Sequence, residues 1–151
     1  MKSFLFSRSL WIYHYPAADC GGCKMEIETI NRVFHDAMLP APELVKNIRR
    51  ADLLLITGMV NFSHVSQIKL LYSQAPRPIY VIAAGVCALD GGIFRESYSI
   101  APPLERHIPV DIYIPGCPPR PEAIMDGVSK LLSKIKISEK QKKAKKNTRN
   151  A

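Results

Sequence analysis

Short apolar segments alternate along this chain with longer segments of helical periodicity. Four of the apolar segments have the length of a strand and are rich in aliphatic, β-branched or aromatic residues: 9–15 (SLWIYHY), 51–57 (ADLLLIT), 79–83 (IYVIA) and 111–114 (DIYI). The segment 51–57 is almost continuously apolar, which is typical of a strand buried on both faces. We therefore predict four strands of a parallel sheet that helices cover.

Helices are predicted in the intervals between the strands. The first spans about residues 24–36. Ser63 is expected to cap the second, in which apolar residues recur on one face as far as about Gln74. Pro121 begins the last helix, which is expected to end near Ile135.

The element order β-α-β-α-β-loop-β-α predicts a three-layer α/β domain with a mostly parallel sheet, similar in plan to flavodoxin. Right-handed crossovers place the carboxyl ends of all the strands along one edge of such a sheet. Open α/β sheets bind their ligands at that edge. Candidate functional residues are therefore expected just after the strands.

The formal net charge of +8 is concentrated at the carboxyl terminus. Residues 134–151 contain eight Lys or Arg and one acid, Glu139, whereas residues 1–133 contain 13 basic and 12 acidic residues. We predict an iron–sulfur α/β domain over residues 1–135, for the reasons that follow, and a basic, disordered tail over residues 136–151. The tail lacks interleaved aromatic residues, so nucleic acid is not an expected partner. A solvated tail and attraction to anionic lipid remain open.

Four cysteines could form two disulfides or a metal site. The chain contains no run of about 18 apolar residues and no convincing export signal, so we expect a reducing compartment and free thiols. Metal binding is therefore favoured over disulfides.

All four cysteines follow predicted strands, and glycines surround them. Cys20 and Cys23 follow the first strand, Cys87 the third and Cys117 the fourth. Glycine lets the backbone approach a buried inorganic group and offer it N–H donors. One close pair and two isolated cysteines favour an iron–sulfur cluster over a zinc site, which usually has two close pairs. Zinc and a thioredoxin-like CxxC motif remain open on spacing alone.

One segment closely resembles a known family. Residues 116–123 (GCPPRPEA), preceded by 109–115 (PVDIYIP), resemble the cluster-binding end of the small subunits of membrane-bound, energy-converting NiFe hydrogenases and of the homologous cluster-N2 subunit of respiratory complex I. The resemblance extends over about residues 8–135 and includes three further motifs: 23–26 (CKME), 56–58 (ITG) and 85–87 (GVC).

The resemblance implies that the chain is an electron-transfer subunit without a catalytic site of its own. It implies one 4Fe-4S cluster, held by four ligands: Cys20, Cys23, Cys87 and Cys117. Its implied partners are a ferredoxin-like iron–sulfur subunit, a NiFe large subunit and integral membrane subunits that translocate ions. The implied location is peripheral, on the cytoplasmic face of the cell membrane.

The first cysteine pair bears on the branch of the family. Two residues separate Cys20 from Cys23, as in the hydrogenase small subunits, whereas the complex I subunits have adjacent cysteines. The hydrogenase branch is favoured; a complex I-like quinone oxidoreductase and a related sulfur-reducing complex are the alternatives. Here Asp19 precedes the pair and Lys24 follows it, which departs from the Ser-Cys-Asn-Gly-Cys-Asp pattern of the hydrogenases and changes the local charge.

Two charged residues near the cysteines have two readings each. Glu26 is either a carboxylate on a proton path at the large-subunit interface, by resemblance, or a charge that favours the start of a helix. Arg120 either lies over the cluster or contacts a partner, or is a solvated surface residue. The four histidines are scattered and predict no metal-ligand pair.

Overall fold

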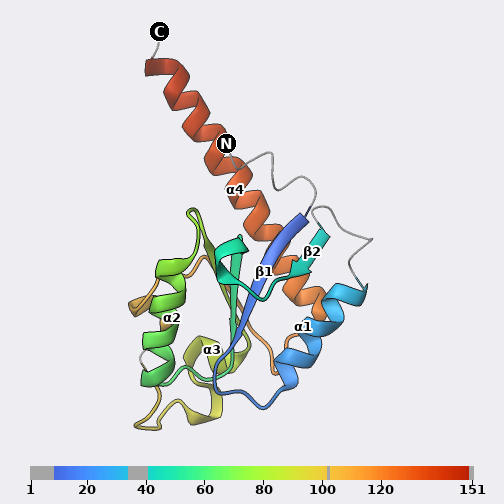
Figure 1. The fold of residues 1–151 in the computed structure, drawn as a ribbon, viewed down its shortest axis with the longest axis vertical. Coiled ribbons are helices and arrows are strands. Elements are labelled where there is room, and N and C mark those ends of the chain that lie inside the picture. The colour runs from blue at the N-terminus through green and yellow to red at the C-terminus, as the bar shows by residue number, and fades with distance from the viewer. Residues whose placement is uncertain (1–8, 34–40, 102, 150–151) are drawn as a thin grey trace.

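The computed structural model describes residues 9–33, 41–101 and 103–149. Its elements follow one another as β1 (Ser9–Pro16), α1 (Gly22–Val33), β2 (Ala41–Leu44), the 3₁₀ turn η2 (Ile48–Arg50), β3 (Leu53–Thr57), α2 (Phe62–Gln74), β4 (Tyr80–Ala84), α3 (Val86–Asp90), the 3₁₀ turns η3 (Gly92–Phe94) and η4 (Leu104–Arg106), β5 (Ile112–Ile114) and α4 (Pro121–Arg149). Figure 1 shows their arrangement.

The five strands form one sheet in the order β2-β1-β3-β4-β5, and every neighbouring pair is parallel. This is the strand order of flavodoxin-like folds. The predicted three-layer α/β fold is therefore confirmed. Sequence analysis missed β2, because its sequence APEL combines a proline and a glutamate in a four-residue edge strand.

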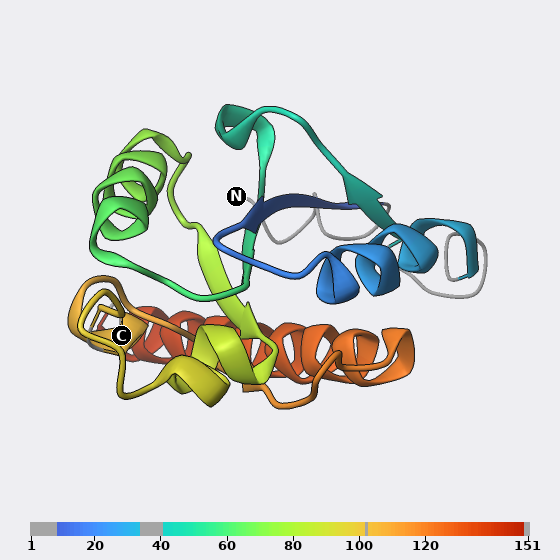
Figure 2. The same cartoon turned by 90° about the horizontal axis from the view of Figure 1, so that it is seen from below.

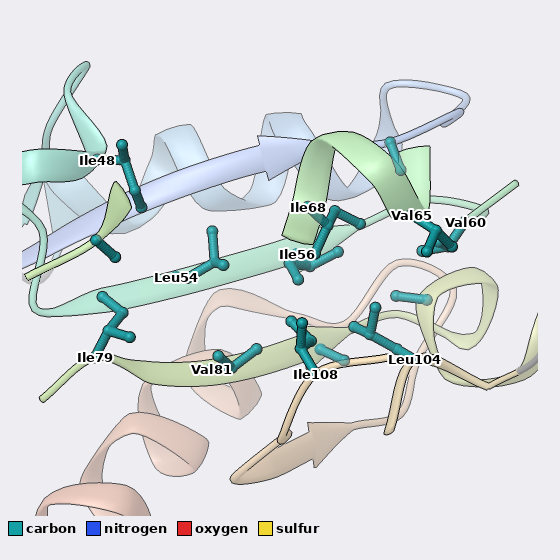
Figure 3. Close-up of a cluster of buried hydrophobic side chains, with 14 of the residues drawn as sticks. Ile48, Leu54, Ile56, Val60, Val65, Ile68, Ile79, Val81, Leu104 and Ile108 are labelled. Carbon is teal, nitrogen blue, oxygen red and sulfur yellow. The ribbon is translucent and has the colours of Figure 1, made fainter. Parts of the chain in front are cut away.

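Each face of the sheet has its own hydrophobic core. On one face, α2 and the segment before β5 pack against β3 and β4, with Leu54, Ile56, Ile68, Val81 and Leu104 in contact (Figure 3). On the other face, α1 and α4 cover the sheet with residues that include Ile27, Ile124 and Val128 (Figure 2). β3 contributes alternate residues to both cores, which explains its uninterrupted apolar sequence.

The second helix begins two residues earlier than predicted. Its N-cap is Asn61, whose side chain accepts a hydrogen bond from the backbone N–H of His64 at 3.0 Å. Ser63 is not the cap; it lies inside α2, and its hydroxyl donates to Asn61 Oδ1 at 2.8 Å. Asn and Ser both cap helices well, so composition alone does not distinguish them.

The last helix is longer than predicted. We expected it to end near Ile135, but α4 continues to Arg149. Lys, Gln, Glu and Ala favour helices, and neither Pro nor Gly occurs after Gly127. In Figure 1 this part of α4 projects beyond the sheet. No helix in the described ranges is both long and apolar enough to cross a membrane.

The first predicted helix agrees with α1 as far as Val33, and residues 34–36 lie outside the described residues. The short helix α3 was predicted as a loop. Its five residues are fewer than hydrophobic periodicity needs for detection.

Candidate metal centre

The four cysteines lie along the carboxyl-terminal edge of the sheet. Cys20 is in the turn between β1 and α1, and Cys23 is the second residue of α1. Cys87 is the second residue of α3, which follows β4, and Cys117 follows β5. All four are free thiols. Figure 2 views the molecule from the end where these strands finish.

These segments surround one cavity. Its volume is about 620 Å³, and Cys20, Cys87 and Cys117 line it together with Asp19 and residues 92–96. Cys23 does not line this cavity. Its Sγ atom is 2.9 Å from the position that a Cβ atom of Gly85 would occupy, which places it against the turn that follows β4. Separate segments of the chain thus present their thiols to one region.

The thiols affect one another electrostatically. Burial raises the pKa of Cys23 to about 11, with further contributions from Cys87, Cys20, Asp19 and Cys117. Burial also raises the pKa of Cys87, followed by the effects of Cys117 and Cys20. A negative charge on one thiol thus opposes a charge on its neighbours. A bound cation removes this opposition, since metal ligation requires the thiolate form.

The cysteines do not converge on one point: three of them border the cavity, and Cys23 does not line it. Within the described ranges, no group of three or more His, Cys, Asp and Glu side chains is arranged to hold a metal ion. In a 4Fe-4S cluster each cysteine binds a different iron, so four thiols around a larger space suit the cluster without converging on one atom. The donor set of four cysteines fits such a group.

Backbone hydrogen bonds hold the cysteine segments to the sheet and to one another. Ala17 N donates to Thr57 O at 2.8 Å, and Ala18 and Met59 exchange bonds of 3.1 and 2.7 Å, which attach the Cys20 segment to the end of β3. Likewise Gly85 N donates to Ile114 O at 2.8 Å, and the next residue along donates to Gly116 O at 2.9 Å. The second set of bonds fixes the position of the Cys87 segment relative to the Cys117 segment.

Gly116 permits the close turn at Cys117. Its φ angle is +147°, and a Cβ atom there would lie 2.6 Å from Pro119 Cα. Backbone atoms cannot move aside as a flexible side chain can, so a larger residue would displace the Pro118–Pro119 segment and Cys117 with it.

Asp19 is a site residue that sequence analysis noted only as a change of local charge. Its Oδ1 atom accepts a hydrogen bond from Gly21 N at 3.2 Å. Its Oδ2 atom is buried and has no hydrogen-bond partner within the described part of the chain. The carboxylate lines the cysteine cavity, and its negative charge contributes to the raised pKa of Cys23 and Cys87.

Comparison with known proteins identifies the family. A sequence model described as NADH ubiquinone oxidoreductase, 20 Kd subunit, matches residues 20–131. The chain belongs to this family. It is therefore of the type found as a subunit of oxidoreductase complexes, and the resemblance expected from the sequence is confirmed.

Two curated relatives show the breadth of the family. The chain is 44% identical over 128 residues to the probable membrane-bound hydrogenase subunit mbhJ of Pyrococcus furiosus, covering 85% of this chain and 77% of the relative. It is 39% identical over 132 residues to an NADH-quinone oxidoreductase subunit of Salinispora tropica, covering 87% of this chain and 69% of the relative. The hydrogenase and quinone branches named above are thus both represented.

A solved structure also has this fold. A chain of the membrane-bound sulfane sulfur reductase, an archaeal respiratory membrane complex, superimposes with a TM-score of 0.72 at 39% identity, covering 86% of this chain and 72% of that one. The family member described here therefore resembles subunits of hydrogenase, quinone and sulfur-reducing complexes.

An apolar rim, Ile93 and Phe94, borders the cysteine cavity and was not predicted. Ile93 is 90% exposed and Phe94 is 48% exposed. Tyr98, in the same segment, is 97% exposed. Large apolar side chains exposed together next to a cavity are typical of an interaction site. The sequence signal was the apolar pair after Gly91-Gly92, which on its own resembles a core segment.

The charged candidates from the sequence lie near the cavity but do not line it. Glu26 is half-buried, one turn beyond Cys23 in α1, and has no ion-pair or hydrogen-bond partner within the described ranges. Arg120 is exposed, just before α4.

Two of the histidines form contacts with residues other than the cysteines. His14 Nε2 forms a 2.8 Å hydrogen bond with Thr57 Oγ1, and the ring of His64 packs edge-on against Tyr15. His35 lies outside the described residues.

Proposed function

We propose that Cys20, Cys23, Cys87 and Cys117 hold one 4Fe-4S cluster, and that the chain relays electrons within a membrane-bound oxidoreductase complex. The observation that carries this proposal is that Cys20, Cys87 and Cys117, from segments far apart in the sequence, line one cavity at the carboxyl edge of the sheet, close enough to Cys23 to raise its pKa. Family membership supports the same assignment.

The residues of the chain hold the cluster and control its surroundings. When bound, a 4Fe-4S cluster supplies one-electron transfer. The four thiolates ligate it, and the raised pKa of Cys23 and Cys87 means that protons leave these thiols on binding. Gly22, Gly85 and Gly92 have no side chain next to the cysteine sulfurs, so backbone N–H groups can approach the thiolates there. Hydrogen bonds from such N–H groups tune the reduction potential of a cluster.

We place the catalytic reaction in a partner subunit. The chain is proposed to receive electrons from a ferredoxin-like subunit and to pass them to a NiFe large subunit that contacts the apolar rim of Ile93 and Phe94. The two-residue gap between Cys20 and Cys23 and the 44% identity to a hydrogenase subunit favour this branch. Glu26 is half-buried in α1, one turn beyond Cys23, and is proposed to serve a proton path at the contact with the large subunit.

A quinone-reducing or sulfur-reducing complex is the second candidate. The sulfur branch is favoured by one specific observation, the TM-score of 0.72 to a chain of a sulfane sulfur reductase. In each case the chain would sit on the cytoplasmic face of the membrane beside integral subunits that couple electron transfer to ion translocation.

Electron paramagnetic resonance of the dithionite-reduced complex, purified without oxygen, tests the proposal. Iron, sulfide, nickel and zinc are quantified in the same sample. A 4Fe-4S signal that is lost in Cys117→Ala and kept in Ser66→Ala, an exposed position on α2, is expected. Nickel in the complex supports the hydrogenase branch; a cluster without nickel supports the second candidate. Zinc without sulfide would overturn the redox function.

A further inference from the structure

The basic residues of the described chain gather at the edge of the sheet opposite the cysteines. The turns that precede β3 and β4, residues 45–52 and 75–79, contain four basic residues, Lys46, Arg49, Arg50 and Arg77, and one acid, Asp52. α4 runs away from the cysteine edge (Figure 1). Lys134 lies at this end, because its Nζ atom is 3.5 Å from the backbone oxygen of Asp111, just before β5, and Lys136 follows two residues later. These six residues, and the part of α4 beyond them, are called the basic edge below.

The six side chains are accessible and their charges are not neutralised. All six are exposed, and none forms an ion pair with another residue of the described chain. Arg50 lies over the ring of Trp11 at 5.0 Å, and Arg77 lies over the ring of Tyr72 at 4.3 Å. Stacking of this kind orients a guanidinium without using its N–H donors, so both remain available to anions.

The basic edge continues into the projecting part of α4. Residues 137–149 include Lys140, Lys142, Lys143, Lys145 and Lys146, with Glu139 as the one acid. No apolar residue larger than alanine follows Ile137, so this part of the helix has no apolar stripe to bury. Like charges three and four residues apart disfavour a helix, and an anionic surface relieves that repulsion.

The cysteine edge of the sheet is acidic and partly apolar, in contrast to the basic edge. The segments around the cysteines, residues 17–28, 85–100 and 115–122, contain six acidic and three basic residues. The exposed apolar residues Phe62, Ile93, Phe94 and Tyr98 also lie toward this edge. Protein interfaces are enriched in aromatic and depleted in lysine side chains. A protein partner therefore suits the cysteine edge, whereas the lysine-rich, apolar-poor edge suits a polyanionic surface.

We propose that the basic edge binds the anionic headgroups of a phospholipid membrane. Charges spread over two turns and a projecting helix, which adds about 20 Å beyond residue 135, match a flat anionic surface better than a single acidic pocket. The relatives named as membrane-bound favour lipid over other polyanions. The proposal rests on the proposed function only in taking the chain as part of a membrane-bound complex.

Vesicle binding of the 151-residue chain tests this assignment. Vesicles of phosphatidylcholine alone are compared with vesicles that contain about 30 mol% phosphatidylglycerol, a composition on the order of natural anionic membranes. Two double variants each remove two charges, Arg49→Gln with Arg77→Gln and Lys142→Gln with Lys143→Gln. The matched control is Lys69→Gln with Arg106→Gln, which removes two exposed charges in α2 and η4.

The wild-type chain is expected to bind the anionic vesicles and not to bind the neutral ones. Each basic-edge pair should lower the partition coefficient roughly thirtyfold, from about 1 kcal/mol for each basic residue, and the control pair should not. Equal losses in the control pair, or equal binding to both vesicle types, would overturn the proposal. The proposal would also be overturned if duplex DNA or polyglutamate displaced the chain from anionic vesicles as effectively as the lipid itself. The basic edge would then bind any polyanion and would not be selective for lipid. The cluster spectrum of each sample reports on the proposed function separately.

Discussion

Gly85 lies directly beneath the sulfur of Cys23. A Cβ atom at Gly85 would be 2.9 Å from Cys23 Sγ, and the φ angle of Gly85 is +92° with ψ at 147°. Gly85 also donates its N–H to Ile114 O, which joins the turn after β4 to the end of β5. Gly85 therefore contacts both Cys23 and the end of the strand that leads to Cys117.

Replacing Gly85 by alanine should remove much of the cluster. The added methyl group pushes on Cys23 Sγ, and the backbone conformation is one that only glycine adopts readily, at a cost of about 1–3 kcal/mol. We expect Gly85→Ala to purify with less than about half of the wild-type iron and sulfide. The matched control is Gly22→Ala, whose Cβ would be 3.5 Å from Cys20 Sγ, an ordinary contact at a position without a positive φ. Full cluster content in Gly85→Ala would contradict this account.

Removing the charge of Asp19 should raise the reduction potential. Its buried Oδ2 has no partner in the described chain, so the carboxylate is not offset locally. A negative charge disfavours the addition of an electron to a neighbouring cluster. We expect Asp19→Asn to shift the midpoint potential upward, on the order of 50 mV, in a redox titration followed by paramagnetic resonance.

The control for Asp19 is Asp126→Asn. Asp126 is also a single carboxylate, but it pairs with Lys130 on the outer surface of α4. The same loss of charge there should leave the potential unchanged. Equal shifts in the two variants would indicate an effect of net charge rather than of the site.

His14 should make the stability of the chain depend on pH. Burial lowers the pKa of His14, and the ring hydrogen-bonds to Thr57, which is fully buried. The folded state therefore binds a proton less readily than the unfolded state, whose histidine pKa is about 6.5. The contribution of neutral His14 to the free energy of unfolding is fully present above a pH of about 6.5. It is lost as the pH falls from that value toward the lowered pKa of His14 in the folded state.

Urea unfolding at about pH 8 and about pH 5.5 measures this dependence. The wild-type chain should lose more stability between the two pH values than His14→Gln, whose side chain does not titrate. The variant itself should lose about 1 kcal/mol at the higher pH because a buried hydrogen bond is altered. Parallel losses in both proteins would exclude His14 as the cause.

Features with a regular sequence pattern were predictable. β3 contributes alternate residues to both cores, so its sequence is apolar throughout and was recognised as a central strand. Each cysteine follows a strand, and parallel topology brings the ends of all strands to one edge. The order of elements was therefore sufficient to bring Cys20, Cys87 and Cys117 to one cavity.

Features that depend on tertiary contacts were not predictable. β2 has a weak strand sequence and pairs only with β1 within the described sheet, and Asn61 rather than Ser63 is in position to cap α2. The Asp19 oxygen that no described residue hydrogen-bonds and the exposure of Ile93 arise from how the turns fold over the cavity. A sequence pattern records which residues are apolar or charged, but not which of their atoms remain uncovered.

The apolar rim should bind the partner subunit. Ile93 is 90% exposed beside the cysteine cavity, and burying an isoleucine against a partner is worth about 1.5–3 kcal/mol. A glutamate there would lose this gain and add a charge to be desolvated, so Ile93→Glu should weaken binding of the large subunit at least about tenfold. Leu70→Glu, at an exposed leucine on α2, is the matched control and should assemble normally. Co-purification of the complex measures assembly, and the unchanged spectrum of the reduced cluster verifies folding. Normal assembly of Ile93→Glu with an intact cluster would place the catalytic partner on another surface.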